Sequence, residues 1–204
     1  MDGVNLPETT ATMTVNITTA AQAEADTRHW LERAVIGLNL CPFAKAVHVR
    51  GQIHYAVHLA GDADAALLGA VLAEAAALVS HPASVRDTTL LIAPNTLVDF
   101  LDFNDFTVRA EKRLARAGYE GTLQLASFHP RFQFAGTAED DIGNATNRAP
   151  YPTLHLLREE SIDRAVEAFP EAEAIFGRNI ETLEALGTAG WAALGVGPGG
   201  GVVR

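Results

Sequence analysis

The residues of this chain that could perform chemistry are concentrated in one stretch, from Ser127 to Thr153. This stretch reads SFHPRFQFAGTAEDDIGNATNRAPYPT and combines a histidine, two arginines, three acids and two asparagines. Connections longer than about 15 residues without regular structure are uncommon in compact domains and are often functional. Four aromatic residues argue against disorder. We therefore expect an ordered functional loop.

His129 is the first candidate for a catalytic group, as a general acid or base. An imidazole titrates near neutral pH, which suits proton transfer. Side-chain alternation along a strand places Ser127 and His129 on the same face. The alternative is a histidine at the end of a strand that hydrogen-bonds the loop backbone. The sequence is consistent with both interpretations.

Cys41 is the second candidate, as a nucleophile. If Cys41 caps a short helix opened by Pro42, backbone N–H groups and Lys45 would lower its pKa. If it ends the preceding helix instead, the thiol stays inert, and a lone cysteine is more often a small buried hydrophobe. Ala44 stands where a CxxC redox site would have its second cysteine, which excludes dithiol cycling within the chain.

Arg131 and Arg148 are candidates for an anion clamp. Two guanidinium groups with nearby amide donors suit a carboxylate or phosphate. A weak capping pattern predicts a short helix over residues 138–145, with Asp140 and Asn144 on one face as orienting groups. The alternative is that both arginines pair with acids of the same loop and only lock it.

Apolar patterning predicts the elements that must position this loop. Alternation of strands with helices indicates right-handed crossovers between parallel strands. We therefore expect a single α/β domain with a mixed, mostly parallel four-stranded sheet, packed with about five helices. The expected strands span 53–59, 88–93, 121–128 and 153–157. The first expected helix spans 26–41, with Asp26 or Thr27 as its cap, and a short helix follows at 42–46. Further helices are expected at 62–79, 96–117, 161–169 and 170–186.

This topology places the candidate residues at one edge of the sheet. Ligands of open α/β sheets bind outside the carboxyl ends of parallel strands. The second strand ends at Asn95 and the third at His129 and Arg131. We expect these three residues at the same edge as the loop. The fourth strand follows no crossover helix, so it could be antiparallel.

Composition narrows the class of protein and its partners. With 204 residues, 48% of them apolar and 20% charged, the chain is long enough for one globular domain. We expect flexible tails at 1–23 and 191–204 around a domain at 24–190. A net charge of −10 argues against nucleic acid and membrane partners. One cysteine and the lack of an apolar leader predict a cytoplasmic protein.

No spacing of ligands in the sequence predicts a metal site or a cofactor. His54 and His58 share a strand face but would lie roughly 13 Å apart. Asp99, Asp102 and Asp105 recur on one helix, where a solvated face is the simpler explanation. We expect neither metal nor cofactor.

Five blocks of the sequence are similar to one protein family. They are WLERAVIGLNLCPFA, TLLIAPN, SFHPRFQFAGT, DDIGNATNRAPYPTLHLLRE and RNIETLEALGTAGW. On these blocks the chain resembles the bacterial domain-of-unknown-function family 1415 from about Trp30 to Trp191. The resemblance implies a stand-alone bacterial cytoplasmic protein. It implies no activity, so no catalytic residue is carried over.

The leading hypothesis is an enzyme, either a hydrolase or a transferase, that acts on a small anionic metabolite. His129 would be the acid or base, and Cys41 the nucleophile if it lies within hydrogen-bond reach. The alternative is a small-ligand-binding or regulatory module that uses the same pocket without catalysis. A third hypothesis is an interaction domain whose loop is only a scaffold. The expected substrate-binding residues are Arg131, Arg148, Asn144, Asn95 and Lys45.

Overall fold

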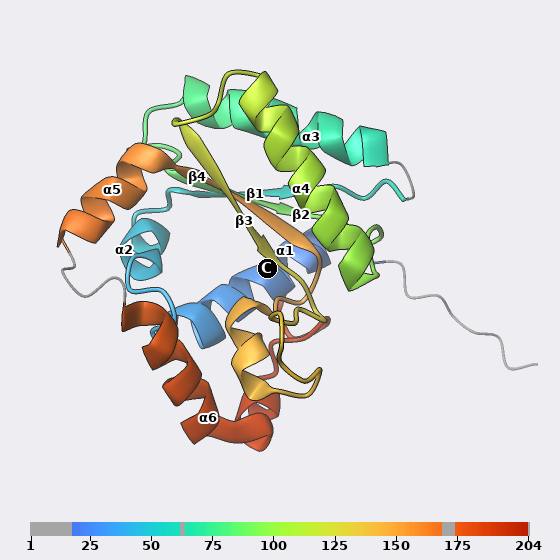
Figure 1. The fold of residues 1–204 in the computed structure, drawn as a ribbon, viewed down its shortest axis with the longest axis vertical. Helices are drawn as coiled ribbons and strands as arrows, with labels where there is room; N and C mark the ends of the chain where they lie inside the picture. The colour runs from blue at the N-terminus through green and yellow to red at the C-terminus, as the bar shows by residue number, and fades with distance from the viewer. Residues whose placement is uncertain (1–17, 62–63, 169–173, 204) are drawn as a thin grey trace, which may run out of the picture.

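Four strands form a single sheet in the order β1-β2-β4-β3. In this computed structural model, residues 18–61, 64–168 and 174–203 are described (Figure 1). The strands are β1 (Ile53–Val57), β2 (Thr88–Ile92), β3 (Leu123–Phe128) and β4 (Thr153–Arg158). All four lie where the apolar patterning predicts them.

The prediction of a mostly parallel sheet is wrong. β1 pairs with β2 in parallel, but β4 runs antiparallel to both β2 and β3. The long loop after β3 lets the chain turn back and enter the sheet between those two strands. Because β4 opposes both neighbours, β1, β2 and β3 still point the same way. Their carboxyl ends therefore share one edge, and the broad α/β class is confirmed.

The described residues contain six α-helices, rather than about five, together with one π-helical and one 3-10 segment. The bounds are α1 (Ala20–Trp30), η1 (Leu31–Ile36, π), α2 (Ala44–Val49), α3 (Asp64–Ser80), α4 (Phe100–Arg116), η2 (Ile142–Asn147, 3-10), α5 (Glu159–Ala168) and α6 (Ile175–Ala193). None of these helices combines the length and the apolar character that a membrane span requires.

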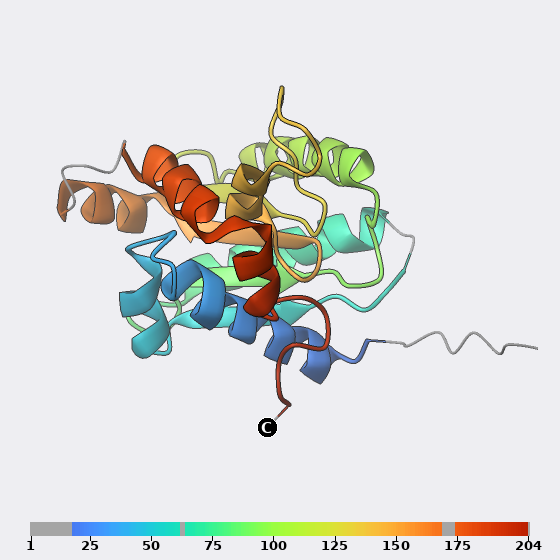
Figure 2. The same ribbon diagram turned by 90° about the horizontal axis from the view of Figure 1, so that it is seen from below.

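Helices cover both faces of the sheet. Figure 2 shows α4 on one side of the sheet and α1 on the other. On the α3 and α4 side, Leu91 and Leu154 pack with Phe103 and Phe106 in one core cluster. On the α1 side, Trp30 packs with residues of β1 and β2 in a second cluster. Apolar burial on both faces stabilises the central position of the sheet.

The first helix begins earlier than the sequence predicts. Thr19 caps α1 by accepting a hydrogen bond from the backbone N–H of Gln22. The predicted caps, Asp26 and Thr27, are instead fully buried within the helix. The predicted boundary of the N-terminal tail at residue 23 is therefore too far along the chain, since α1 begins at Ala20 and Ala23 belongs to the core. Residues 1–17 lie outside the described parts of the chain.

The predicted C-terminal tail at 191–204 is also corrected. α6 continues to Ala193 past a kink at Gly187, which has a φ of 68° and was the expected helix end. The glycine-rich segment that follows packs against α1, where the amides of Gly199 and Gly201 donate to Asp26. A Cβ atom on Gly201 would lie 2.2 Å from the carbonyl carbon of Ala25. Only glycine therefore allows this approach.

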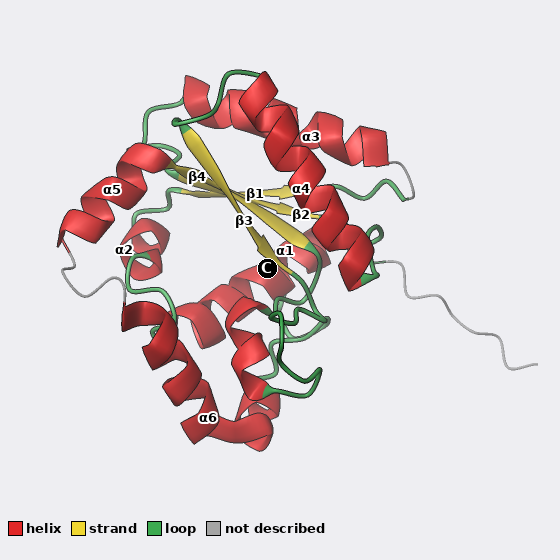
Figure 3. Cartoon of the chain, viewed as in Figure 1, coloured by secondary structure: helices red, strands yellow, loops and turns green. Residues whose placement is uncertain are grey.

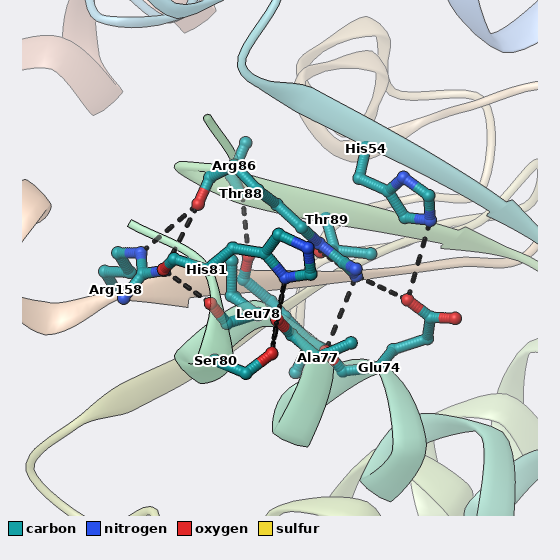
Figure 4. Close-up of polar contacts among 11 residues, drawn as sticks. His54, Glu74, Ala77, Leu78, Ser80, His81, Arg86, Thr88, Thr89 and Arg158 are labelled. Atoms are coloured by element: carbon teal, nitrogen blue, oxygen red, sulfur yellow. Dashed lines mark hydrogen bonds and ion pairs between the residues drawn. The ribbon is translucent and has the colours of Figure 1, made fainter. Parts of the chain in front are cut away.

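Two buried arginines cross-link the other end of the sheet to α3 (Figure 4). Arg86 donates to Thr89 and pairs with Glu74, which lies 3.7 Å from the His54 ring. Arg158 donates to the backbone carbonyls of Leu78, His81 and Arg86. These contacts join α3, β2 and β4 at the end of the sheet opposite the loop.

Candidate functional site

The loop between β3 and β4 borders an open hollow of about 450 Å³. The loop runs as irregular chain interrupted by η2 (Figure 3). Five of its residues line the hollow, namely Pro130, Arg131, Glu139, Asp140 and Arg148. The structure therefore brings both predicted arginines and the predicted Asp140 to one place. The lining combines two guanidinium groups with two carboxylates.

Arg148 is held in this hollow by backbone carbonyls. Its Nε donates to the carbonyl of Phe132 at 3.2 Å, and its Nη2 donates to that of Glu139 at 2.6 Å. In the described parts of the chain, Arg148 forms no ion pair. The alternative in which loop acids neutralise both arginines is therefore not what the structure shows. The Arg148 side chain is therefore oriented by the loop backbone and not by an acidic partner among the described residues.

Arg131 reaches across to the start of α4. Its Nη2 donates to the carbonyl of Val98 at 2.8 Å and to Asp99 Oδ2 at 3.3 Å. Asp99 caps α4, and the N–H groups of Asp102 and Leu101 hold the pKa of its carboxyl below the usual value. Because Arg131 is exposed, this ion pair contributes little to stability.

His129 lies at the predicted edge but does not face the hollow. Its side chain is 1% exposed, between the rings of Phe100 and Phe103. Alternation along β3 places it on the same side as Leu123 and Leu125, the side that α4 covers. The expected convergence of His129 with Arg131 and Arg148 is therefore incorrect.

Both ring nitrogens of His129 are engaged by the backbone. Nδ1 accepts from the N–H of Arg131 at 3.1 Å, and Nε2 contacts the carbonyl of Leu97 at 3.0 Å. A backbone N–H only donates, so Nδ1 carries the lone pair and Nε2 carries the proton. Burial lowers the pKa of His129. This is the loop-bonded histidine of the alternative interpretation, and it also fixes Leu97, whose φ is 54°.

The loop is ordered by buried amide contacts and by rings. Asn144 is fully buried, accepts from the Phe134 N–H and Thr137, and donates to the carbonyl of Ala138. It holds the loop and does not line the hollow. The predicted short helix forms later than expected, at η2, because Asp141 caps it. Rings at Phe100, Phe132, Phe134 and Phe176 follow one another at centroid distances of 4.9 to 5.5 Å.

Cys41 and Lys45 lie away from this site. Cys41 is half-buried and packs against the core cluster on the α1 side, whereas His129 packs on the α4 side. The two side chains therefore lie on opposite faces of the sheet. Burial raises the pKa of the Cys41 thiol, despite backbone N–H groups of Phe43 and Ala44 that lower it. The structure does not support the proposed nucleophile–base pair.

The remaining predicted residues do not line the hollow either. Lys45 is exposed on α2, which packs beside η1. Asn95 donates to the carbonyl of Leu59 at 3.0 Å and ties the end of β2 to the segment after β1. Within residues 18–61, 64–168 and 174–203, no three side chains of His, Cys, Asp or Glu gather as metal ligands would.

A second hollow of about 310 Å³, which the sequence did not predict, lies beside the first. Pro130 and Arg148 line both hollows, and Trp191 lines the second. The role of Asp26, which anchors the wall of this second hollow, was not predicted either. A signal existed, because Asp26 falls on the same helical stripe as Ala23 and Trp30, where an acid needs buried partners.

Comparison with known proteins gives one match. The model of a family described as "Protein of unknown function (DUF1415)" matches residues 22–193. This confirms the resemblance carried by the five sequence blocks. No curated protein and no solved structure matches the chain. The description of the family assigns no activity, so functional inference depends on the geometry above.

Proposed function

The chain belongs to this family of proteins of unknown function (DUF1415), and we propose that it binds a small organic anion in the hollow beside Arg131 and Arg148. The anionic group is a carboxylate or a phosphate, because guanidinium groups bind both through paired hydrogen bonds. Glu139 and Asp140 accept hydrogen bonds from hydroxyl or amino groups of the same ligand.

One observation carries the proposal, namely the state of Arg148. Its guanidinium lines the hollow, is oriented by two backbone carbonyls and has no acidic partner among the described residues. An arginine that is already ordered loses little side-chain entropy when it binds a ligand. Its remaining N–H groups are donors for an incoming anion.

Binding is favoured over catalysis, since His129 is buried and both its nitrogens are occupied. Enzymatic activity in the same hollow stays a prediction, with Asp140 as the exposed carboxylate able to act as a base. Turnover of a bound ligand that is lost in Asp140→Asn, with binding retained, would establish it.

The first experiment compares ligand binding by Arg148→Ala with binding by the native chain. A thermal-shift screen of small carboxylates and phosphates, followed by calorimetric titration, should find ligands whose affinity falls at least about 10-fold in Arg148→Ala, the loss expected for a charge-assisted contact. Arg109→Ala is the matched control, because it removes the same charge from an exposed ion pair on α4.

Two results would contradict the proposal. One is a screen in which no carboxylate or phosphate shifts the melting temperature. The other is a ligand that binds Arg148→Ala and Arg109→Ala with equal affinity. The second result would place the anion site elsewhere on the molecule.

We also propose a bacterial, cytoplasmic setting in which the partner is a metabolite, and neither nucleic acid nor a membrane. The net charge of −10 disfavours anionic polymers and surfaces, and a single cysteine is compatible with a reducing compartment. Binding of the purified chain to DNA or to anionic vesicles at physiological salt would contradict this assignment.

A further inference from the structure

The second hollow differs in character from the first. The larger side chains of its lining are Pro130, Arg148, Pro150, Trp191, Val196 and Pro198. Arg148 is the charged residue of its lining, and proline rings and an indole supply the apolar surface. Apolar pockets with one or a few convergent polar groups are typical of small-molecule sites.

The two hollows are continuous in their lining at Arg148 and Pro130. A ligand anchored on the Arg148 guanidinium is therefore adjacent to the apolar surface of Trp191 and Pro150. Trp191 is half-buried near the end of α6, so part of its ring remains available for stacking. Planar groups stack on indole and proline rings with favourable dispersion and hydrophobic contributions.

We infer that the ligand is an aryl-substituted organic anion: its carboxylate or phosphate lies on Arg148 and its planar apolar group occupies the hollow beside Trp191. This inference rests on the proposed function and extends it from an anion to a ligand with two chemically distinct ends. The acids Glu139 and Asp140 lie in the same lining and accept hydrogen bonds, so a ligand that also carries a hydroxyl group, such as a hydroxy acid, supplies a donor to them.

The wall of the second hollow is formed in advance. The segment from Gly195 to Pro198 follows α6. Just after it, the backbone amides of Gly199 and Gly201 donate to Asp26 at 2.8 and 2.7 Å. Val196 is buried against the α1-side core. Because this segment is already fixed, binding a planar group in the hollow needs no ordering of the wall.

The test uses matched ligand pairs that differ by one phenyl group. Phenyllactate is compared with lactate, and phenyl phosphate with inorganic phosphate, by calorimetric titration of the full chain. We expect the phenyl member of at least one pair to bind at least 10-fold tighter. Binding of the phenyl member should also change the tryptophan fluorescence of the chain. This change can be assigned to Trp191, because the other tryptophan, Trp30, is only 2% exposed in the core.

Two variants of the second hollow separate the apolar contribution from the anionic one. Trp191→Ala should remove the gain from the phenyl group and leave the affinity for lactate or phosphate within about 2-fold. Because Trp191 also packs in the core, its replacement could disturb the fold, so Ala192→Leu is the second variant. Ala192 is exposed and lines the hollow, and a leucine side chain at this position would fill it. Ala189→Leu is its matched control, exposed on the same helix outside the lining.

The outcomes distinguish this inference from the proposed function. Equal binding of both members of each pair, with loss of both in Arg148→Ala, would keep the anion site and overturn the aryl class. A phenyl preference that Ala192→Leu leaves unchanged would also overturn it. Absence of binding by all four probes would overturn the inference, and the screen of carboxylates and phosphates then decides whether the anion site remains. Binding that is insensitive to Arg148→Ala would overturn the proposed function and the inference together.

Discussion

Asp26 is a fully buried carboxylate that forms no ion pair within the described residues. Its oxygens accept hydrogen bonds from the Tyr151 hydroxyl, the Gln22 amide and the backbone amides of Gly199 and Gly201. Four donors replace the water that a buried charge loses. Burial and the Asp26 carboxylate raise the pKa of Tyr151, so its hydroxyl stays a donor.

Replacement of Asp26 by asparagine should therefore destabilise the fold. The new NH₂ group would face N–H donors that now meet a carboxylate oxygen, and at least one of them would be left unpaired. We expect the free energy of unfolding to fall by about 2–3 kcal/mol. Urea unfolding followed by circular dichroism measures this change.

The matched control for this prediction is Asp105→Asn. Asp105 lies exposed on α4, and the same change there should alter stability by less than about 0.5 kcal/mol. Equal effects of Asp26→Asn and Asp105→Asn would show that the buried contacts of Asp26 contribute nothing specific.

At the scale of elements, Arg158 connects the end of α3 to β4. It is 8% exposed, and its guanidinium donates to the carbonyls of Leu78, His81 and Arg86. The last carbonyls of a helix have no partner within the helix, so an outside donor must satisfy them. Arg158 performs this role for α3 and for the turn that leads to β2.

Arg158→Met keeps the length and apolar stem of the side chain but removes these donors. We expect a loss of about 2–4 kcal/mol in the free energy of unfolding, because three carbonyls, two of them in buried contacts, lose a charged partner. Hydrogen exchange should also become faster in the last turn of α3. Arg164→Met, at an exposed position on α5, is the control and should be nearly neutral. Unchanged exchange in α3 would refute this role.

The elements themselves were largely predictable from apolar periodicity, but their order in the sheet was not. All four strands and the helices between them occur where the pattern places them. Periodicity carries information about neighbours in sequence. It carries none about the return of β4 between β2 and β3, which depends on a loop that could accommodate other paths.

The site was predictable to a similar extent. Arg131, Arg148 and Asp140 line one hollow because they belong to a single loop whose ends are held by neighbouring strands. His129 and Cys41 were predicted as catalytic residues from the chemistry of their side chains alone. Where those side chains point is decided by packing, which places them on opposite faces of the sheet. His129 faces α4 with the leucines of β3, as strand alternation alone could have indicated.

At the scale of the whole molecule, acid stability depends on histidines that the fold keeps neutral. Burial lowers the pKa of His155 to about 4, and the pKa of His129 also lies below its usual value. In the unfolded chain a histidine has a pKa of about 6.5. The stability contributed by the neutral rings is therefore complete above about pH 6.5 and is lost as the pH falls toward 4.

This relation predicts a loss of about 2–3 kcal/mol from His155 between pH 7 and pH 4. His155→Gln should reduce that loss, since glutamine keeps a donor for Thr88 Oγ1, which lies 2.6 Å from Nε2, and takes up no proton. Urea unfolding at several pH values measures the slope. The same slope in His155→Gln and the native chain would refute the prediction.

Two of the four partners of Asp26, the backbone amides of Gly199 and Gly201, lie 173 and 175 positions further along the chain. During translation, helix α1 leaves the ribosome long before Gly199 and Gly201 are synthesised. Until then the Asp26 carboxylate lacks two of its four donors and needs water in their place, so α1 cannot complete its docking on the sheet. The native state is consequently reached only after Gly199 and Gly201 have been made, and nascent chains arrested before Gly199 should remain accessible to proteases and chaperones at α1.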